Sequence, residues 1–302
     1  MITLSNLSKK FAGQFVVKDL NIKIRQGEIV GLLGPNGAGK TTTLRMISGV
    51  LPPSTGSVSI DNKNIAKFES LKNRIGYLPE NNPLYSDLTV EEYLSFWADM
   101  KNIPAPLRRE SMNFVIDSCG IAVVFYRPIS ELSKGFRQRV GLAQAILSKP
   151  EILIFDEPTE GLDPNQRRDI AVLIKDLGKK RTVIISSHVL TELARLASRM
   201  IVIHKGNIVA DDTPQNLKKI GSLSNVVEME IIGGNIISQL KKVTGVIEVN
   251  QIKKNFFRIE IEKKYDIRRE LFNLAVKNKW IVLTLVAKER AIEDVFSQLT
   301  SS

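Results

Sequence analysis

A glycine-rich segment ending in a lysine and a threonine is the part of this sequence best suited to chemistry. It joins the apolar run 28–33 to the helical pattern 42–48, the context of a phosphate-binding loop, or P-loop. Its glycines let consecutive backbone N–H groups surround an anion, and the helix N-terminus adds partial positive charge. Lys40 is then placed for the β- and γ-phosphates and Thr41 for Mg²⁺, whereas a turn that only caps a helix is the alternative. The predicted nucleotide-binding residues are Gly34, Pro35, Asn36, Gly37, Ala38, Gly39, Lys40, Thr41 and Thr42.

Two adjacent acids and a histidine come at the ends of two other apolar runs. Asp156 and Glu157 follow the run 151–155, and His188 follows the run 181–187. The carboxyl ends of parallel strands meet at the edge of a sheet where ligands bind, so we expect these three side chains near the P-loop. A purely structural role is the alternative for each. The sequence favours a role in the ligand site.

Two further features allow a functional and a structural interpretation. Ser133 is a good N-cap for the helix that runs to residue 147, and Gly135 keeps the preceding loop open. This makes a second helix N-terminus able to hold an anion, or simply a cap. Phe11 stands next to a turn ahead of the P-loop. Its ring could stack on an adenine or pack in the core, and the residues alone do not separate these alternatives.

The composition fits a nucleotide-handling protein of the cytoplasm. The chain has 302 residues, 43% of them apolar, and a net charge of +11. No uncharged apolar run approaches the roughly 18 residues that span a bilayer, and the first residues lack a signal-peptide pattern. The basic excess is spread along the chain rather than concentrated, so DNA binding is disfavoured. The single cysteine, Cys119, is expected to be a buried bystander.

The elements that must position these residues form an α/β pattern with an insertion. Antiparallel strands over residues 2–25 lead into the P-loop strand, and a helical insertion spans about residues 86–148. Residues 221–302 follow the order βαββαβ, which favours a small ferredoxin-like α+β domain, with a closing helix at 291–299. We therefore expect an α/β P-loop ATPase domain at 1–220 and an accessory α+β domain at 221–302.

Taken in order, these residues resemble the ATP-binding subunit of ABC transporters over nearly all of residues 1–220. The matching positions are Phe11 at the adenine-stacking site, 34–41 as Walker A, Glu80 in the Q-loop, 132–135 as the signature, Asp156 as Walker B, Glu157 as the catalytic acid, 161–163 as the D-loop and His188 as the switch histidine. The family's usual Gln is Glu80 here, and its signature Leu-Ser-Gly-Gly-Gln becomes Leu-Ser-Lys-Gly-Phe. The sequence is most similar to the ABC-2 exporter branch. Residues 75–85 and 132–139 look like the gliding-motility ATPases.

The resemblance implies ATP hydrolysis in a head-to-tail homodimer or heterodimer. Each ATP would lie between one P-loop and the Ser133, Lys134 and Gly135 segment of the other subunit. Glu157 would polarise the attacking water and His188 would contact the γ-phosphate. The implied Mg²⁺ ligands are Thr41, Glu80 and Asp156.

The same resemblance implies partners at the inner face of the cell membrane. Separate integral-membrane permease subunits would dock near the Q-loop and the helical insertion. Nucleic acid is not an expected partner. A soluble ABC ATPase acting on ribosomes or nucleic acid, and a P-loop kinase or GTPase, are the competing hypotheses. The kinase or GTPase hypothesis leaves the signature, the D-loop and His188 unexplained.

Overall fold

The computed structural model describes residues 1–220, 224–262 and 266–288, and it divides into two compact units, Met1–Pro214 and Gln215–Ser302. This division falls at the first residue of helix α7 (Pro214–Ile220), whereas the sequence analysis placed the domain boundary after that helix. Within the described ranges, no helix combines the length and the apolar character needed to cross a bilayer.

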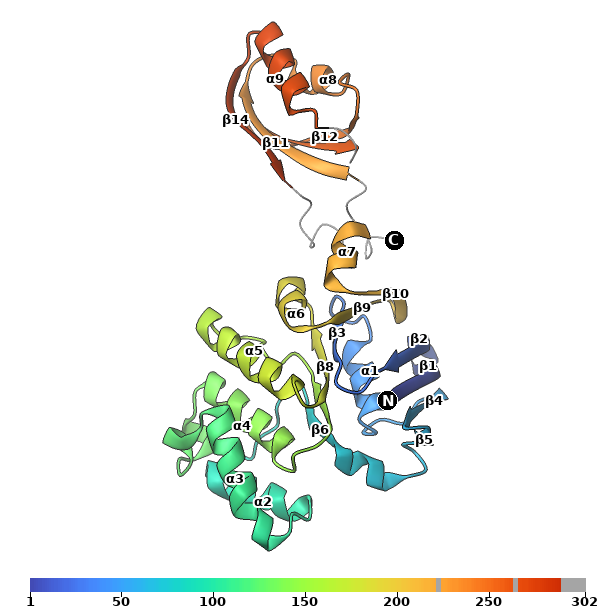
Figure 1. Ribbon diagram of the computed structural model, residues 1–302, viewed down its shortest axis with the longest axis vertical. Helices are drawn as coiled ribbons and strands as arrows, with labels where there is room; N and C mark the ends of the chain where they lie inside the picture. Colours follow the sequence, from blue (N-terminus) through green and yellow to red (C-terminus); the bar gives the residue numbers. More distant parts are fainter. Residues whose placement is uncertain (221–223, 263–265, 289–302) are drawn as a thin grey trace. The chain divides into compact units, whose positions relative to one another are not determined.

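A six-stranded sheet forms the centre of the first unit (Figure 1). Its order is β10-β9-β3-β8-β7-β6, with parallel pairing except between β9 and β10. The strands are β3 (Ile29–Leu33), β6 (Ile75–Leu78), β7 (Ile152–Phe155), β8 (Thr182–Ser187), β9 (Arg199–His204) and β10 (Asn207–Asp212). Every residue of β7 and β8 is buried, as expected for parallel strands covered on both faces. The carboxyl ends of β3, β6, β7 and β8 therefore meet at one edge.

A four-stranded antiparallel sheet packs against the same core. It has the order β2-β1-β4-β5 and contains β1 (Ile2–Phe11), β2 (Gln14–Ile24), β4 (Thr55–Ile60) and β5 (Lys63–Asn64). Helix α1 (Lys40–Ile47) contributes Leu44 to a cluster that joins Leu4 of this sheet to Ile201 of the central sheet. The 3-10 helix η1 (Glu69–Arg74) leads from this sheet into β6. The P-loop helix is thus held between the two sheets.

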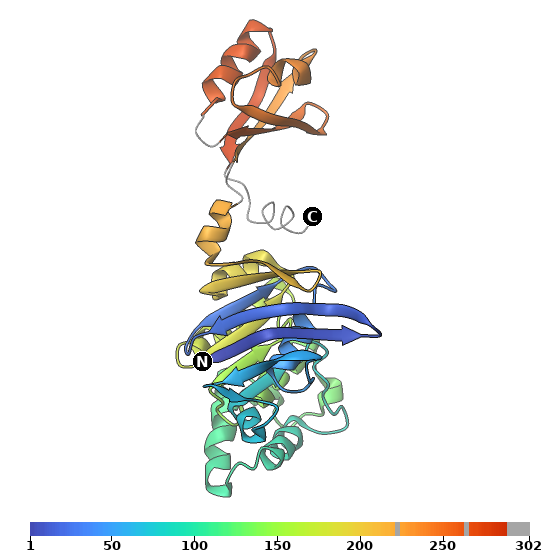
Figure 2. The same cartoon turned by 90° about the vertical axis from the view of Figure 1, so that its right-hand side faces the viewer.

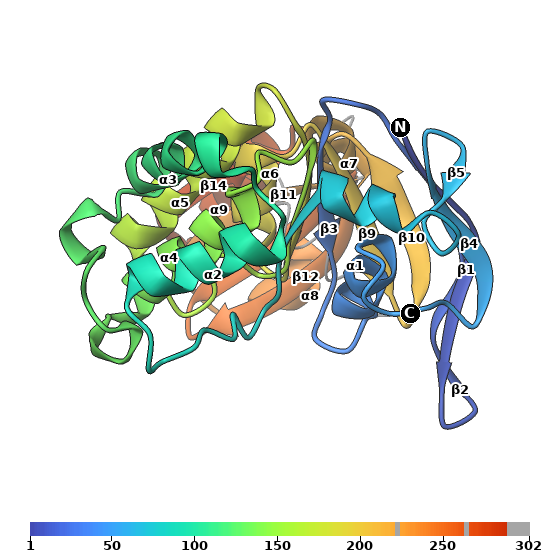
Figure 3. The same ribbon diagram turned by 90° about the horizontal axis from the view of Figure 1, so that it is seen from below.

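The predicted helical insertion lies on the side opposite the antiparallel sheet (Figure 3). It comprises α2 (Val90–Met100), α3 (Ala105–Cys119), η2 (Ala122–Val124), η3 (Ile129–Glu131) and α4 (Lys134–Ile146). The predicted capping box is present, because Thr89 and Glu92 exchange side-chain and backbone hydrogen bonds. Cys119 is fully buried, and burial raises the pKa of its thiol to about 12, which fits the expected inert role.

Two helices follow the strands that carry the predicted acids and histidine. Helix α5 (Pro164–Gly178) begins at the predicted N-cap, since the Asp163 carboxylate accepts hydrogen bonds from the backbone of Asn165 and Gln166. Helix α6 (Leu190–Leu196) begins two residues after His188. Both helices therefore begin shortly after β7 and β8 end at the carboxyl edge of the central sheet.

The second unit has the predicted βαββαβ order. It contains β11 (Ser224–Ile232), α8 (Ile236–Leu240), β12 (Val246–Lys253), β13 (Phe256–Glu262), α9 (Arg268–Lys277) and β14 (Ile281–Lys288). All strand pairs are antiparallel in the order β12-β13-β11-β14, the split βαβ arrangement. Both helices cover one face, where Leu240 and Leu271 join Met229 in a core (Figure 2). The fold class is confirmed, while the helix predicted at 291–299 lies outside the described residues.

Candidate functional site

The P-loop connects β3 to α1 and is shaped by glycines. Gly37 and Gly39 have φ angles of 79° and 105°, in the left-handed region that only glycine adopts without cost. A side chain at Gly34 would collide with the backbone oxygen of Ile203 on β9. The loop is also fixed from outside, since the Gly206 N–H donates to the Ala38 carbonyl over 3.0 Å. These contacts hold the backbone in the form that the sequence predicted.

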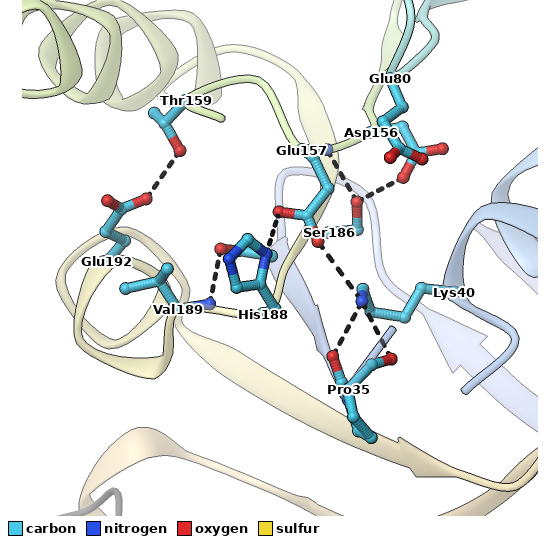
Figure 4. Close-up of polar contacts among 12 residues, drawn as sticks. Pro35, Lys40, Glu80, Asp156, Glu157, Thr159, Ser186, His188, Val189 and Glu192 are labelled. Atoms are coloured by element: carbon cyan, nitrogen blue, oxygen red, sulfur yellow. Dashed lines mark hydrogen bonds and ion pairs between the residues drawn. The ribbon is translucent and has the colours of Figure 1, made fainter. Parts of the chain in front are cut away.

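The ammonium of Lys40 lies under this loop and is 6% exposed. It donates to the Gly34 carbonyl at 2.8 Å and to the Pro35 carbonyl at 3.4 Å, and it lies 3.3 Å from Oε1 of Glu157 (Figure 4). A buried cation is costly unless it is paired, so this site favours anionic groups beside Lys40. The phosphate chain of a nucleotide is such a group.

Three oxygen-bearing side chains meet beside the P-loop. The Thr41 hydroxyl donates to Asp156 Oδ1 at 3.2 Å and lies 3.3 Å from Glu80 Oε2. Asp156 is fully buried, and its Oδ2 has no hydrogen-bond partner among the described residues. Burial raises the Asp156 pKa, the charges of Glu80 and Glu157 raise it further, and hydrogen bonds from Ser186 and Thr41 oppose the rise. An unpaired buried carboxylate oxygen among oxygen ligands fits a hard divalent cation such as Mg²⁺.

Glu157 is held from three directions (Figure 4). Its N–H donates to Ser186 Oγ at 2.9 Å, its Oε1 faces Lys40, and its Oε2 lies 3.0 Å from Nδ1 of His188. Its φ of 47° is unusual for a residue with a side chain and is sustained only where the surroundings over-determine it. The carboxylate is therefore buried and aimed, as a general base requires.

A pocket of about 300 Å³ opens over these groups. Its lining contains the predicted residues 36–42, together with Glu80 and Glu157. Val16, which the sequence analysis missed, also lines it from β2. An apolar residue in an alternating strand carries no sequence signal that separates it from core positions.

Phe11 lies at the end of β1, and its ring is 47% exposed. The ammonium of Lys9 lies 5.3 Å from the ring centroid, so one face of the ring is covered by a cation. The exposure favours the stacking alternative for this ring over the core alternative.

Ser133 caps α4 as predicted, accepting a hydrogen bond from the Phe136 N–H at 3.4 Å. The side chain of Lys134 lies over Gly161 of the D-loop, and that of Gln166 lies against Gly135. Among the described residues, no hydrogen bond or ion pair joins Ser133, Lys134 or Gly135 to the P-loop of the same chain. Lys134 nevertheless lines a pocket together with Glu157 and His188.

Three polar residues that the sequence analysis did not single out connect the motifs. Ser186 Oγ donates to Asp156 Oδ1 at 2.6 Å and accepts from the Glu157 backbone. Asn82 donates to the Arg137 carbonyl at 2.8 Å, joining the loop after Glu80 to α4. Gln138 of α4 donates to the Pro158 carbonyl at 2.8 Å, directly after Glu157. Ordinary polar residues of this kind gain a role only from the packing that surrounds them.

The sequence and the fold both match ATP-binding proteins of ABC transporters. The family model described as ABC transporter matches residues 17–160. The bacitracin transport ATP-binding protein BcrA of Bacillus licheniformis is 32% identical over 99% of this chain and 97% of its own length. The linearmycin resistance ATP-binding protein LnrL of Bacillus subtilis is 31% identical over 99% of this chain and 98% of its own. The dimeric structure of MJ0796, a bacterial ABC transporter cassette, is 28% identical with a TM-score of 0.65, covering 71% of this chain and 99% of that one.

Proposed function

This chain belongs to the ABC transporter family, and from that premise we propose that it is the ATPase of an ABC-2 type exporter whose permease is a separate polypeptide. As a member of that family it is an ATP-binding subunit and an ATPase. The observation that carries the catalytic assignment is the contact of the buried Glu157 carboxylate with both Lys40, which is buried, and His188, whose side chain is partly exposed. It places a carboxylate between the phosphate-binding lysine and the histidine.

The chemistry follows from these positions. Lys40 and the backbone N–H groups of the P-loop bind the β- and γ-phosphates. Glu157 accepts a hydrogen bond from the attacking water and takes its proton as the water oxygen bonds to the γ-phosphorus. The bond from the γ-phosphorus to the bridging oxygen breaks in the same step, and ADP leaves. His188 fixes the carboxylate through Oε2 and presents its other ring nitrogen to the γ-phosphate.

Mg²⁺ is the cofactor that the donor set fits. Thr41, Asp156 and Glu80 would hold it, either directly or through water. When bound, it neutralises charge on the β- and γ-phosphates. A bound Mg²⁺ would lower the raised pKa of Asp156 towards its ordinary range, because a nearby cation favours the ionised carboxylate.

We infer that hydrolysis requires a head-to-tail dimer. The N-terminus of α4 offers an anion site through the Ser133 hydroxyl and the backbone N–H groups of Lys134 and Gly135. Among the described residues that site makes no hydrogen bond or ion pair with the P-loop of its own chain, and we infer that the P-loop of a second subunit faces it. The relative MJ0796, which is dimeric in its solved structure, supports this arrangement.

The permease would dock on the aromatic cluster of Tyr85, Tyr93, Phe96 and Trp97, through its exposed members Tyr85 and Phe96. Tyr85 packs edge-on against Tyr93 and Phe96, with centroids 5.8 and 5.5 Å apart. Tyr85 and Phe96 are 51% and 39% exposed, whereas Tyr93 is buried. Exposed rings on a rigid base are typical anchors of an interface. Docking here would place the chain at the inner face of the membrane, with the permease near Asn82 and Glu80.

The cargo is inferred from the two full-length relatives. One serves bacitracin transport and the other linearmycin resistance, which favours an exported antibiotic for this chain as well. A role in gliding motility is the second candidate, supported by the motif segments 75–85 and 132–139. Deleting the gene separates the two, since it would raise sensitivity to antibiotics such as bacitracin or linearmycin in the first case and abolish surface movement in the second.

Copurification tests the proposed partner. The tagged protein, extracted from membranes in mild detergent, should bring down a polytopic membrane protein that mass spectrometry identifies. Tyr85→Ala combined with Phe96→Ala should remove that partner, while Tyr126→Ala, which truncates a ring that is more exposed than either, should retain it. Recovery of ribosomal or DNA-binding proteins instead would refute the transporter assignment.

A further inference from the structure

The signature segment and the D-loop of one chain interlock through two glycines. The ammonium of Lys134 occupies the space that a Cβ at Gly161 would take. In return, the side chain of Gln166 lies 2.7 Å from where a Cβ at Gly135 would stand. Gly161 also has a φ of 67°, so both its backbone and its lack of a side chain are required. Each segment thus fills the gap left by a glycine of the other.

Two polar contacts extend this interlock along the helices. Gln138 Nε2 donates to the Pro158 carbonyl at 2.8 Å, and it is buried. Arg139 Nη2 lies 2.8 Å from Asp169 Oδ2 on α5. Helix α4 is therefore fastened to the chain on both sides of the D-loop.

The loop that Lys134 covers begins at the proposed general base. The Glu160 N–H donates to the Glu157 carbonyl at 3.1 Å, so a shift at Gly161 is passed to Glu157 through one tight turn. Glu157 needs such support because its φ lies in the left-handed region. Lys134 also lines a pocket that contains Glu157, Glu160 and Glu192 together with Arg167.

We propose that Lys134 is a positioning residue in its own chain: its side chain, packed over Gly161, holds the D-loop and thereby the carboxylate of Glu157. This explains how the signature tolerates a long side chain where the family usually has Gly. The side chain points to its own D-loop, and the backbone N–H groups of residues 133–135 stay available to the nucleotide. The expected effect on kcat rests on the proposed role of Glu157, whereas the expected effect on the Tm does not.

A thermal double-mutant cycle tests the contact itself. Gly27→Ala is the matched control, because Gly27 has a φ of 77° and open space around it. We expect Gly27→Ala to lower the Tm by about 2–6 °C through backbone strain alone. Gly161→Ala should lower it further, since the added Cβ must also displace the Lys134 ammonium. In a Lys134→Gly background, the loss should fall to that of Gly27→Ala. An equal loss in both backgrounds would overturn the proposal.

Steady-state kinetics test the positioning role. Lys134→Gly should lower kcat about tenfold and leave the KM for ATP unchanged, because the loss affects only the aim of Glu157. Lys134→Met, which keeps the length of the side chain over Gly161, should recover part of the lost kcat. A Lys134→Gly enzyme with the parent kcat, or one in which only KM rises, would show that Lys134 does not position Glu157. If Glu157→Gln itself leaves kcat unchanged, the proposed base is wrong, while the thermal cycle still decides the contact.

Discussion

Nδ1 of His188 lies 3.0 Å from Oε2 of Glu157, and the two residues come from the ends of neighbouring parallel strands, β8 and β7. The other oxygen of the same carboxylate faces Lys40 at 3.3 Å. The histidine therefore orients the proposed base before it meets any phosphate. Glu157, His188 and Lys40 form one connected group.

Glu157→Gln should slow ATP turnover by about 10²–10⁴ fold while ATP binding persists, because the amide cannot take the proton of the attacking water. That loss corresponds to about 3–5 kcal/mol of barrier. Steady-state phosphate release and an ATP titration measure the two quantities. Glu131→Gln removes an exposed carboxylate and serves as the control. Turnover of Glu157→Gln within threefold of the parent would exclude Glu157 as the base.

Lys40→Ala should weaken ATP binding by at least about tenfold, since the buried ammonium is lost from the phosphate site. It also leaves Glu157 without its ion-pair partner. Isothermal titration with ATP measures the change, and Lys67→Ala, at an exposed lysine, is the control. Unchanged affinity for ATP would contradict the assignment of residues 34–42 as the nucleotide site.

Glu80→Gln should keep hydrolysis within about threefold of the parent, because Thr41 and Asp156 still supply oxygens and the amide oxygen can replace the carboxylate. The Mg²⁺ concentration that gives half-maximal activity should rise, as one negative charge is removed from the site. A Mg²⁺ titration of ATPase activity measures this, with Glu69→Gln, an exposed acid, as the control. Complete loss of activity would show that position 80 does not tolerate glutamine.

Ser186→Ala should lower both kcat and stability. Its hydroxyl bridges Asp156 and the backbone of Glu157. Removal leaves the buried Glu157 N–H without its partner, at a cost of about 1–3 kcal/mol, and takes from Asp156 Oδ1 one of its two hydrogen bonds, the one from Thr41 remaining. Thermal unfolding and phosphate release measure the effects. Ser187→Ala loses only a turn hydrogen bond to Val189 and should retain more of the parent kcat. Equal kcat in the two variants would show that the bridge does not position the acids.

The sequence alone determined the features that depend on local spacing. The P-loop, the acids after β7 and His188 after β8 each follow a short apolar run, and such runs predict buried strands whose ends carry ligands. Helix starts at Thr89, Ser133 and Asp163 were predictable because capping is a contact within three residues. The order βαββαβ of the second unit followed from the same local patterns.

Only the tertiary structure decided which distant residues meet. Ser186 reaches Asp156 because β7 and β8 are neighbours in the central sheet, and a serine in a buried strand does not reveal that order. From the sequence, Lys134 is a cation that could contact a phosphate. In the structure of one chain, its side chain lies over Gly161. Its direction depends on how α4 packs beside the D-loop, which is a contact between residues far apart in sequence. Short-range spacing thus determines what chemistry the chain carries, and long-range packing determines where each side chain is aimed.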